Sequence, residues 1–137
     1  MKTDCFLDTN VLLYLALGRE DDPAKYKRSL VLLQESNFGL SVQVLQEFYV
    51  NAVRKSRRSL SSVRALEWIE EFEQFPCVEI TPGLIKLAIE ISERYRINYW
   101  DGAIIAAADL LEASILYTED LNHGQVYGSV RAVNPYV

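Results

Sequence analysis

The chain has 137 residues, which is typical of one compact domain and long enough to bury a core without disulfides or a structural metal. Half of the residues are apolar, and the apolar segment 11–17 is too short to cross a membrane. We therefore expect one soluble, cytoplasmic domain over residues 1–137. The net charge of −5 argues against a broadly nucleic-acid-binding surface, because affinity for phosphate backbones depends on Lys and Arg.

Short apolar segments alternate with longer amphipathic segments along the chain. The expected strands are 4–8, 37–40, 77–80, 114–118 and 130–133. The expected helices are 10–17, 23–33, 42–53 and 82–91. Two further helices are expected, one that starts near 59–62 and ends at 75, and one that Asp101 opens. We expect Gly18 to end the first helix and Ser41 and Thr81 to cap two others. The alternation predicts an α/β fold with three α/β/α layers and a mostly parallel sheet of about five strands.

Four acidic residues occur where this pattern turns from a strand into a helix, or just inside the helix. They are Asp8, Glu47, Asp101 and Asp120. In open parallel sheets, ligands bind beyond the carboxyl ends of the strands, where Asp8, Ser41 and the turn at 118–120 are expected. Carboxylate oxygens suit hard cations such as Mg²⁺ and Mn²⁺, which complete their coordination with water and substrate phosphate. The pattern therefore predicts a cation site for phosphoryl-transfer chemistry.

For Asp8 and Asp101, capping a helix is the structural alternative to a role in the cation site, because Asp is a favourable N-cap residue. For Asp8 we favour the site over the cap alone. Residues 101, 104, 105 and 108 share one face of a helix, and the other three are apolar. A carboxylate at the end of a buried apolar stripe needs a partner or a cation, which favours a functional role for Asp101.

Glu47 and Asp120 are less clearly marked by the sequence. Glu47 lies almost opposite the apolar stripe centred on Leu45, so helical periodicity alone predicts a solvated side chain. Asp120 follows Glu119, so we expect at most one of the two to face the site and select Asp120. An ordinary turn is an equal alternative for this pair.

One concentrated basic segment, 54–58, follows the expected helix that carries Glu47. A basic run is more often a solvated loop than a binding surface, but this one is the candidate RNA contact. Its basic residues are Arg54, Lys55, Arg57 and Arg58.

Other catalytic chemistries lack the necessary residues. With His123 as the one histidine, neither a paired-histidine ribonuclease mechanism nor a His-rich zinc site can be assembled. The glycines are scattered and form no phosphate-binding loop. Cys5 and Cys77 show no CxxC spacing and are interpreted as free buried thiols.

Four short motifs follow one another along the chain. They are Leu7-Asp8-Thr9-Asn10-Val11, Ser41-Val42-Gln43-Val44-Leu45-Gln46-Glu47-Phe48, Asp101-Gly102-Ala103-Ile104 and Thr118-Glu119-Asp120-Leu121-Asn122-His123-Gly124. Each motif is weak alone. In this order and spacing, over nearly the whole chain, they resemble the PIN-domain nucleases, especially the VapC-type toxin ribonucleases of prokaryotic toxin–antitoxin pairs.

The resemblance implies a set of functional residues and partners. The catalytic residues, which would hold one or two Mg²⁺ or Mn²⁺ ions, are Asp8, Glu47, Asp101 and Asp120. The groups that would orient these ligands or the attacking water are Thr9, Asn10, Ser41 and Thr118. The implied reaction is hydrolysis of RNA to products with 5′-phosphate and 3′-hydroxyl ends. The implied partners are an antitoxin protein and a second copy of the chain.

Two other classes of function fit part of the pattern. A non-catalytic PIN-like binding module would use the acidic pocket to dock a basic residue of a partner protein, and metal-dependent cleavage separates it from the nuclease. A phospho-acceptor signalling domain also places acids at a sheet edge. That class pairs two acids near the N-terminus and adds a late Lys, whereas here Asp4 and Asp8 are spaced differently and no Lys follows Lys86.

Overall fold

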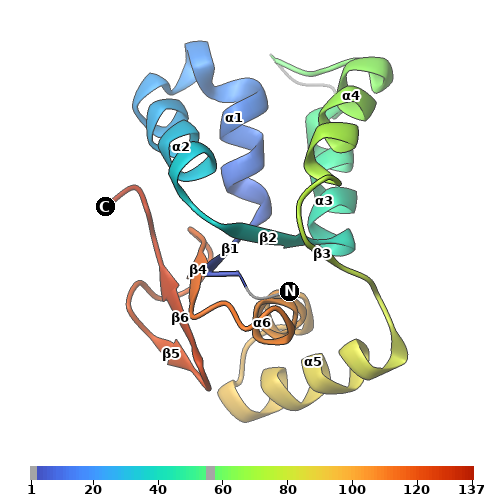
Figure 1. The fold of residues 1–137 in the computed structure, drawn as a ribbon, viewed down its shortest axis with the longest axis vertical. Helices are drawn as coiled ribbons and strands as arrows, with labels where there is room; N and C mark the ends of the chain where they lie inside the picture. The colour runs from blue at the N-terminus through green and yellow to red at the C-terminus, as the bar shows by residue number, and fades with distance from the viewer. Residues whose placement is uncertain (1–2, 55–57) are drawn as a thin grey trace.

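A mostly parallel β-sheet with helices on both faces organises the protein (Figure 1). The computed structural model describes residues 3–54 and 58–137. Within these residues the sheet has six strands in the order β3-β2-β1-β4-β6-β5. The strands are β1 (Cys5–Leu7), β2 (Phe38–Ser41), β3 (Cys77–Val78), β4 (Ile115–Tyr117), β5 (Val126–Tyr127) and β6 (Val130–Val133). The predicted fold class is confirmed, with six strands in place of about five.

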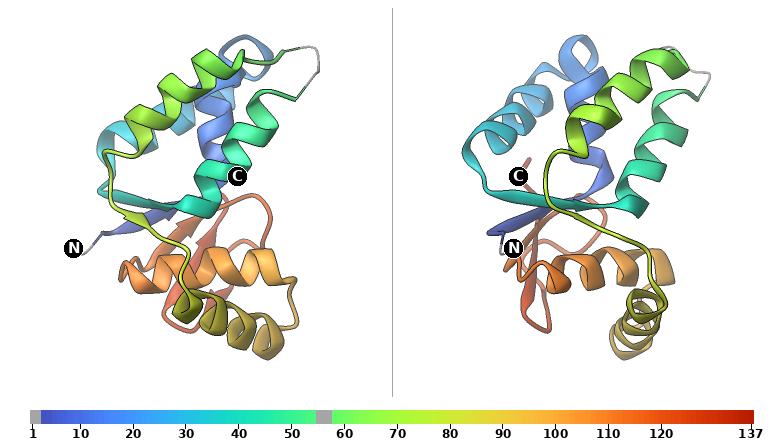
Figure 2. Two further views of the ribbon diagram at one scale, coloured as in Figure 1. Left: turned by 90° about the vertical axis from the view of Figure 1, so that its right-hand side faces the viewer. Right: turned by 45° about the vertical axis from the view of Figure 1, so that its right-hand side comes forward.

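Six helices form the two outer layers in the described residues. They are α1 (Thr9–Asp21), α2 (Pro23–Glu35), α3 (Val42–Ala52), α4 (Ser62–Phe72), α5 (Pro82–Tyr95) and α6 (Tyr99–Leu110). Helices α1 to α4 lie on one side of the sheet and α5 and α6 on the other (Figure 2). None of these helices combines the length and the apolar composition that crossing a lipid bilayer requires.

Strand β1 is central and pairs in parallel with β2 on one side and β4 on the other. Cys5, Phe6 and Leu7 are all buried, as expected for a strand that is covered by helices on both faces. The chain builds the sheet outward in both directions from β1, which makes the end of β1 the switch point of the strand order. Asp8, the next residue, is therefore at the position where such sheets bind ligands.

Capping residues fix the helices next to this edge as predicted. The hydroxyl of Ser41 accepts a hydrogen bond of 3.2 Å from the Val44 amide, and the hydroxyl of Thr81 accepts one of 3.1 Å from the Leu84 amide. Because Ser41 is both the last residue of β2 and the N-cap of α3, α3 begins directly at the carboxyl edge of the sheet.

Helix α1 is longer than predicted, because Gly18 does not end it. The helix continues to Asp21, and the amide of Asp22 donates to the Gly18 carbonyl at 2.8 Å. Gly18 is buried, and a Cβ atom there would lie 3.5 Å from Tyr14 and 3.7 Å from Tyr26 of α2. Gly18 therefore lies inside α1 and packs at ordinary van der Waals distance beside Tyr26 of α2, not at a helix stop.

Strand β5 was not predicted. It has two residues and pairs antiparallel with β6, with Tyr127 opposite Val130 and Gly128 at a φ of 64° in the turn. A two-residue strand carries too short a pattern to show periodicity in the sequence.

Helix α6 is enclosed between the sheet and α5. All residues from Gly102 to Ala108 are buried, which explains a helix that is apolar on every side. At Gly102 an added Cβ atom would lie 2.8 Å from the Ala88 carbonyl oxygen and 3.0 Å from the Ser92 Cβ atom. The backbones of α5 and α6 therefore touch at this point, and this contact fixes the position of the neighbouring Asp101.

Candidate active site

Asp8 is an almost completely buried carboxylate, 4% exposed, at the end of the central strand. Its Oδ1 atom accepts a hydrogen bond from the Thr9 amide, and its Oδ2 atom accepts one from the Thr118 hydroxyl, both at 2.7 Å. Burial raises the pKa of Asp8 to about 7, although the bonds from Thr118 and Thr9 act in the opposite direction. Asp8 is also the N-cap of α1, so the capping role considered for it is observed, and its role in the site stays a prediction.

Glu47 is oriented by two side-chain donors. The Thr9 hydroxyl donates to Glu47 Oε1 at 2.7 Å, and the Gln43 amide donates to Oε2 at 3.3 Å. The side chain is half-buried, so the solvated position that periodicity alone predicted is wrong. The reason is that the buried face of α3 is not the stripe centred on Leu45, which is itself only half-buried. The buried residues of α3 are Gln43, Val44, Phe48 and Ala52, and Glu47 lies beside this face.

Asp101 lies in the first turn of α6, and the N-cap of that helix is Asn98. Asn98 Oδ1 accepts a hydrogen bond of 2.8 Å from the Asp101 amide, while Asn98 Nδ2 donates to Asp101 Oδ2 at 2.9 Å. The prediction that Asp101 opens or caps the helix is therefore wrong, because α6 begins two residues earlier at Tyr99 and is capped by Asn98. Burial raises the pKa of Asp101, the nearby charges of Asp120 and Glu47 raise it further, and the bond from Asn98 opposes them.

The adjacent acids Glu119 and Asp120 have different surroundings. Glu119 accepts a hydrogen bond of 2.7 Å from the Tyr14 hydroxyl and forms an ion pair of 2.6 Å with Lys25. Asp120 is held through its backbone amide, which donates to the Thr118 hydroxyl at 3.0 Å. Burial raises the pKa of Asp120, as do the charges of Glu119 and Glu47, whereas hydrogen bonding with Asp8 and Asn10 lowers it. Asp120 thus interacts with the other site acids, while Glu119 pairs with Lys25.

The four acids form one electrostatic cluster. Asp120 and Glu47 raise the pKa values of both Asp8 and Asp101. Among the described residues, the ion pairs of Lys and Arg are all made with other acids. Two carboxylates 4 Å apart repel each other by roughly 4 kcal/mol at an effective dielectric constant near 20, so an unneutralised cluster favours separation. Among the described residues, no group of three or more Asp, Glu, His or Cys side chains lies close enough together to hold a metal ion in this structure.

The donor set nevertheless suits a hard divalent cation. Its members offer carboxylate oxygens, which Mg²⁺ and Mn²⁺ prefer. In addition, the buried Asn10 Oδ1 atom has no hydrogen-bond partner. A buried acceptor without a donor needs a cation or a water molecule nearby, and Asn10 interacts with Asp120 in the cluster. The residues present therefore fit the predicted cation.

The residues predicted to orient the ligands differ in what they contact. The hydroxyl groups of Thr9 and Thr118 bond directly to carboxylates of the cluster, and Asn10 interacts with Asp120. The Ser41 hydroxyl instead caps α3, so its effect on Glu47 passes through the position of that helix. Gln43 and Lys25, which contact Glu47 and Glu119, were not among the predicted residues.

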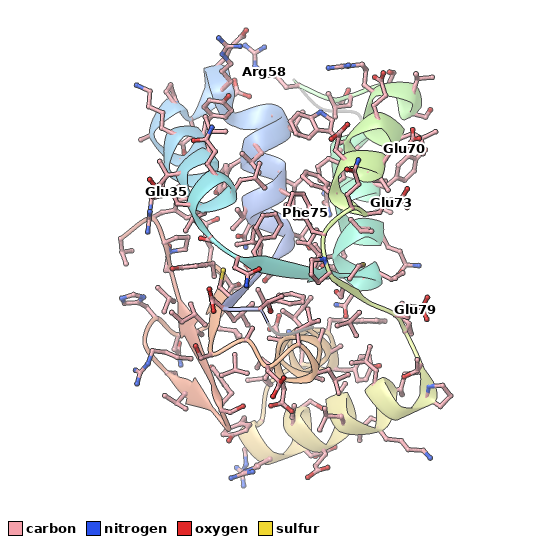
Figure 3. The ribbon with its side chains drawn as sticks, viewed as in Figure 1. Glu35, Arg58, Glu70, Glu73, Phe75 and Glu79 are labelled. Carbon is pink, nitrogen blue, oxygen red and sulfur yellow. The ribbon has the colours of Figure 1, made fainter. Side chains whose placement is uncertain are left out.

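The basic segment after α3 is only partly described. Lys55 and Arg57 lie outside the described residues. Arg54 is exposed, and Arg58 pairs with Glu20 at 2.8 Å and with Asp21 at 2.6 Å, at the end of α1 remote from the sheet (Figure 3). Twelve residues of helix at 1.5 Å each put that end roughly 18 Å from Thr9. The proposed RNA contact by this segment stays a prediction.

The fold and the acid cluster define an α/β protein with a carboxylate-rich site at the switch point of a parallel sheet. The PIN domain family model matches residues 5–128, and the chain belongs to this family. A search of curated proteins found no match to the chain.

Several solved structures share the fold at low sequence identity. A toxin–antitoxin complex from Klebsiella pneumoniae aligns with a TM-score of 0.71 and 17% identity, over 96% of this chain and 98% of that one. VapC20 from Mycobacterium tuberculosis, described as a sarcin–ricin loop cleaving toxin, aligns with a TM-score of 0.68 and 18% identity, over 85% and 89%. VapBC2 from Rickettsia felis, bound to a DNA fragment of its promoter, aligns with a TM-score of 0.63 and 15% identity, over 93% and 96%.

Proposed function

We propose that this protein is a metal-dependent endoribonuclease that hydrolyses RNA phosphodiester bonds and acts as the toxin of a toxin–antitoxin pair. The observation that carries the proposal is the hydrogen-bonded arrangement around Asp8. Thr118 joins Asp8 to the backbone of Asp120, and Thr9, whose amide bonds to Asp8, also bonds to Glu47. Acids from separate segments are thus gathered at the ligand-binding edge of a PIN fold.

Four residues would hold the Mg²⁺ or Mn²⁺ of such an enzyme: Asp8, Glu47, Asp101 and Asp120. A divalent cation in such a site lowers the pKa of an attached water and neutralises charge on the phosphate. The side chains that donate hydrogen bonds to Asp8, Glu47 and Asp101 are neutral, so they orient these carboxylates without supplying the positive charge that a cation would have to displace.

The raised pKa of Asp8, about 7, gives this residue a second part in the proposed function. Near neutral pH, a substantial fraction of the metal-free protein carries a proton on Asp8, and this proton must leave when the carboxylate becomes a ligand. Cation binding should therefore strengthen as the pH rises through 7.

The proposed partners are an RNA substrate, an antitoxin and a second copy of the chain, all in the cytoplasm. The names of the similar structures, which include toxin–antitoxin complexes, support the antitoxin. An acid cluster whose hydrogen-bond donors are neutral is also a suitable receptor for a basic side chain of the antitoxin, which would block the cation site.

Cleavage of a panel of structured RNAs tests the proposal. We expect the purified protein to cleave with Mn²⁺ and not with EDTA, and Asp8→Asn to lower the rate at least about 100-fold, since even groups that only orient metal ligands contribute about 10- to 100-fold. Asp109→Asn, an exposed acid on α6 outside the cluster, is the matched control and should cleave normally. Absence of metal-dependent cleavage by the wild type, with retained binding of a basic partner peptide, would instead identify a non-catalytic binding module.

A further inference from the structure

Gln43 is a buried polar side chain that the proposed catalytic set does not include. It lies in the first turn of α3 and is 7% exposed. Its amide nitrogen donates two hydrogen bonds, one of 3.3 Å to Glu47 Oε2 and one of 3.2 Å to the backbone carbonyl of Trp100. A single amide group therefore contacts both a site carboxylate and the backbone of a different element.

The two acceptors lie on either side of the site. Glu47 belongs to α3 on one face of the sheet, whereas Trp100 belongs to α6 on the other face and directly precedes Asp101 (Figure 2). The Gln43 amide thus connects the carboxylate of one acid with the backbone next to another acid. Since α3 and α6 belong to separate layers, the two hydrogen bonds of Gln43 fix the position of Glu47 relative to Asp101.

The bond to Glu47 also completes the orientation of its carboxylate. Thr9 donates to one oxygen of Glu47 and Gln43 donates to the other. Helical geometry brings side chains four residues apart onto the same face, so position 43 is well placed for this contact. Neutral donors that orient ligand carboxylates commonly contribute about 10- to 100-fold to metal affinity.

We infer that Gln43 is a positioning residue of the cation site: it orients Glu47 and fixes that carboxylate relative to Asp101. The inference rests on the proposed function, because it assigns Gln43 a role toward the cation that the acid cluster would hold. It differs from an ordinary structural role, in which Gln43 would stabilise the fold without affecting cation binding.

Calorimetric titration of the metal-free protein with Mn²⁺ alone tests the inference. Gln43→Met keeps the length and volume of the side chain and removes the donor. Gln46→Met makes the same chemical change on the exposed face of the same helix and is the matched control. We expect the Kd for Mn²⁺ to rise about 10-fold or more in Gln43→Met and to stay at the wild-type value in Gln46→Met. The melting temperature of each metal-free variant is measured in parallel.

A second variant keeps the experiment decisive if Gln43→Met folds poorly. Gln43→Asn retains an amide but shortens it by one methylene, so it should no longer span both acceptors and should weaken Mn²⁺ binding in the same direction. Wild-type Mn²⁺ affinity in the folded variants overturns the inference, whether or not the melting temperature falls, and leaves the nuclease proposal standing. If the wild type itself neither binds Mn²⁺ nor cleaves RNA, the proposed function fails and the role of Gln43 fails with it.

Discussion

The hydroxyl of Thr118 donates a hydrogen bond of 2.7 Å to Asp8 Oδ2 across a separation of 110 positions in the chain. The Thr118 hydroxyl oxygen also accepts a hydrogen bond of 3.0 Å from the Asp120 amide. Thr118 is completely buried, and β4, which it follows, pairs directly with β1. One hydroxyl group therefore ties the acid after the central strand to the acid after its neighbour.

Removing this hydroxyl should destabilise the protein. Thr118→Val keeps the shape of the side chain but leaves a buried carboxylate oxygen and a backbone amide without their partner, which costs about 1 to 3 kcal/mol in the free energy of unfolding. Urea denaturation of the metal-free protein measures the change. Thr118→Ser, which retains the hydroxyl and loses the methyl group, should lose clearly less. A Thr118→Val variant as stable as the wild type would show that the hydrogen bonds of this hydroxyl do not stabilise the fold.

The stability of the metal-free protein should fall as the pH rises from about 4 to 7. Burial raises the pKa of Asp8 from its ordinary value of 3.8 to about 7, so in this window the folded state binds a proton that the unfolded chain does not. The raised pKa values of Asp101 and Asp120 act in the same direction. Melting temperatures in EDTA at pH 5 and pH 8 measure the effect.

Asp8→Asn should reduce this pH dependence, because it removes the most deeply buried acid of the cluster. It should also make the metal-free protein more stable than the wild type at pH 8. Asp4→Asn, at an exposed acid, is the control and should keep the wild-type dependence. A pH dependence in Asp8→Asn identical to that of the wild type would contradict the assignment.

Mn²⁺ should raise the melting temperature of the protein, because a ligand that binds only the folded state stabilises it. At a concentration 100 times Kd the stabilisation is about 2.7 kcal/mol. Asp101→Asn should lose most of this gain, while Asp109→Asn on the same helix should retain it. Melting curves with and without Mn²⁺ decide the question, and a full Mn²⁺ response in Asp101→Asn would remove that residue from the site.

The ion pair of Lys25 and Glu119 should stabilise the protein more than a surface pair does. Its side chains are 33% and 22% exposed, and Lys25 also donates to the Tyr14 hydroxyl at 3.1 Å. Lys25→Met should lower the free energy of unfolding by about 1 to 2 kcal/mol. Arg64→Met breaks a pair whose side chains are 63% and 55% exposed and should change it by less than about 1 kcal/mol. Equal effects in chemical denaturation would contradict the distinction.

Gly102 and Gly83 provide a matched test of the contact between α5 and α6. Alanine is usually favoured over glycine in a helix by about 0.5 to 1 kcal/mol. At Gly83 an added Cβ atom would have only the Thr81 hydroxyl within 4 Å, so Gly83→Ala should be neutral or stabilising. Gly102→Ala would force the backbone of α5 away and should cost about 1 to 3 kcal/mol. Thermal denaturation that ranks the two variants in the opposite order would contradict this packing.

The larger elements of the fold were predictable because each has a local signal. Ser41, Thr81 and Pro23 marked helix starts correctly, since capping and first-turn preferences act within a few residues. Gly18 was misassigned because a glycine also fits inside a helix, and here α1 continues past it to Asp21.

The candidate site was predictable only in part. Asp8 stood out because a charge ended an apolar strand. The orientation of Glu47 depends on Gln43, four residues earlier on the same helix, and on Thr9 from α1, a contact that the sequence does not record. Periodicity gives the angle of each residue on α3, but it does not say which angles the neighbouring elements cover. The choice between Glu119 and Asp120 likewise depended on where Lys25 lies.

The central place of β1 gives the candidate site a mechanical consequence. Asp8 extends from the most enclosed strand, while Glu47 and Asp101 are carried by helices of opposite outer layers. A cation shared by these acids would act as a non-covalent cross-link through the thickness of the domain. Its binding should therefore slow amide hydrogen exchange in α3 and α6 together, whereas β1, already shielded on both faces, has little protection left to gain.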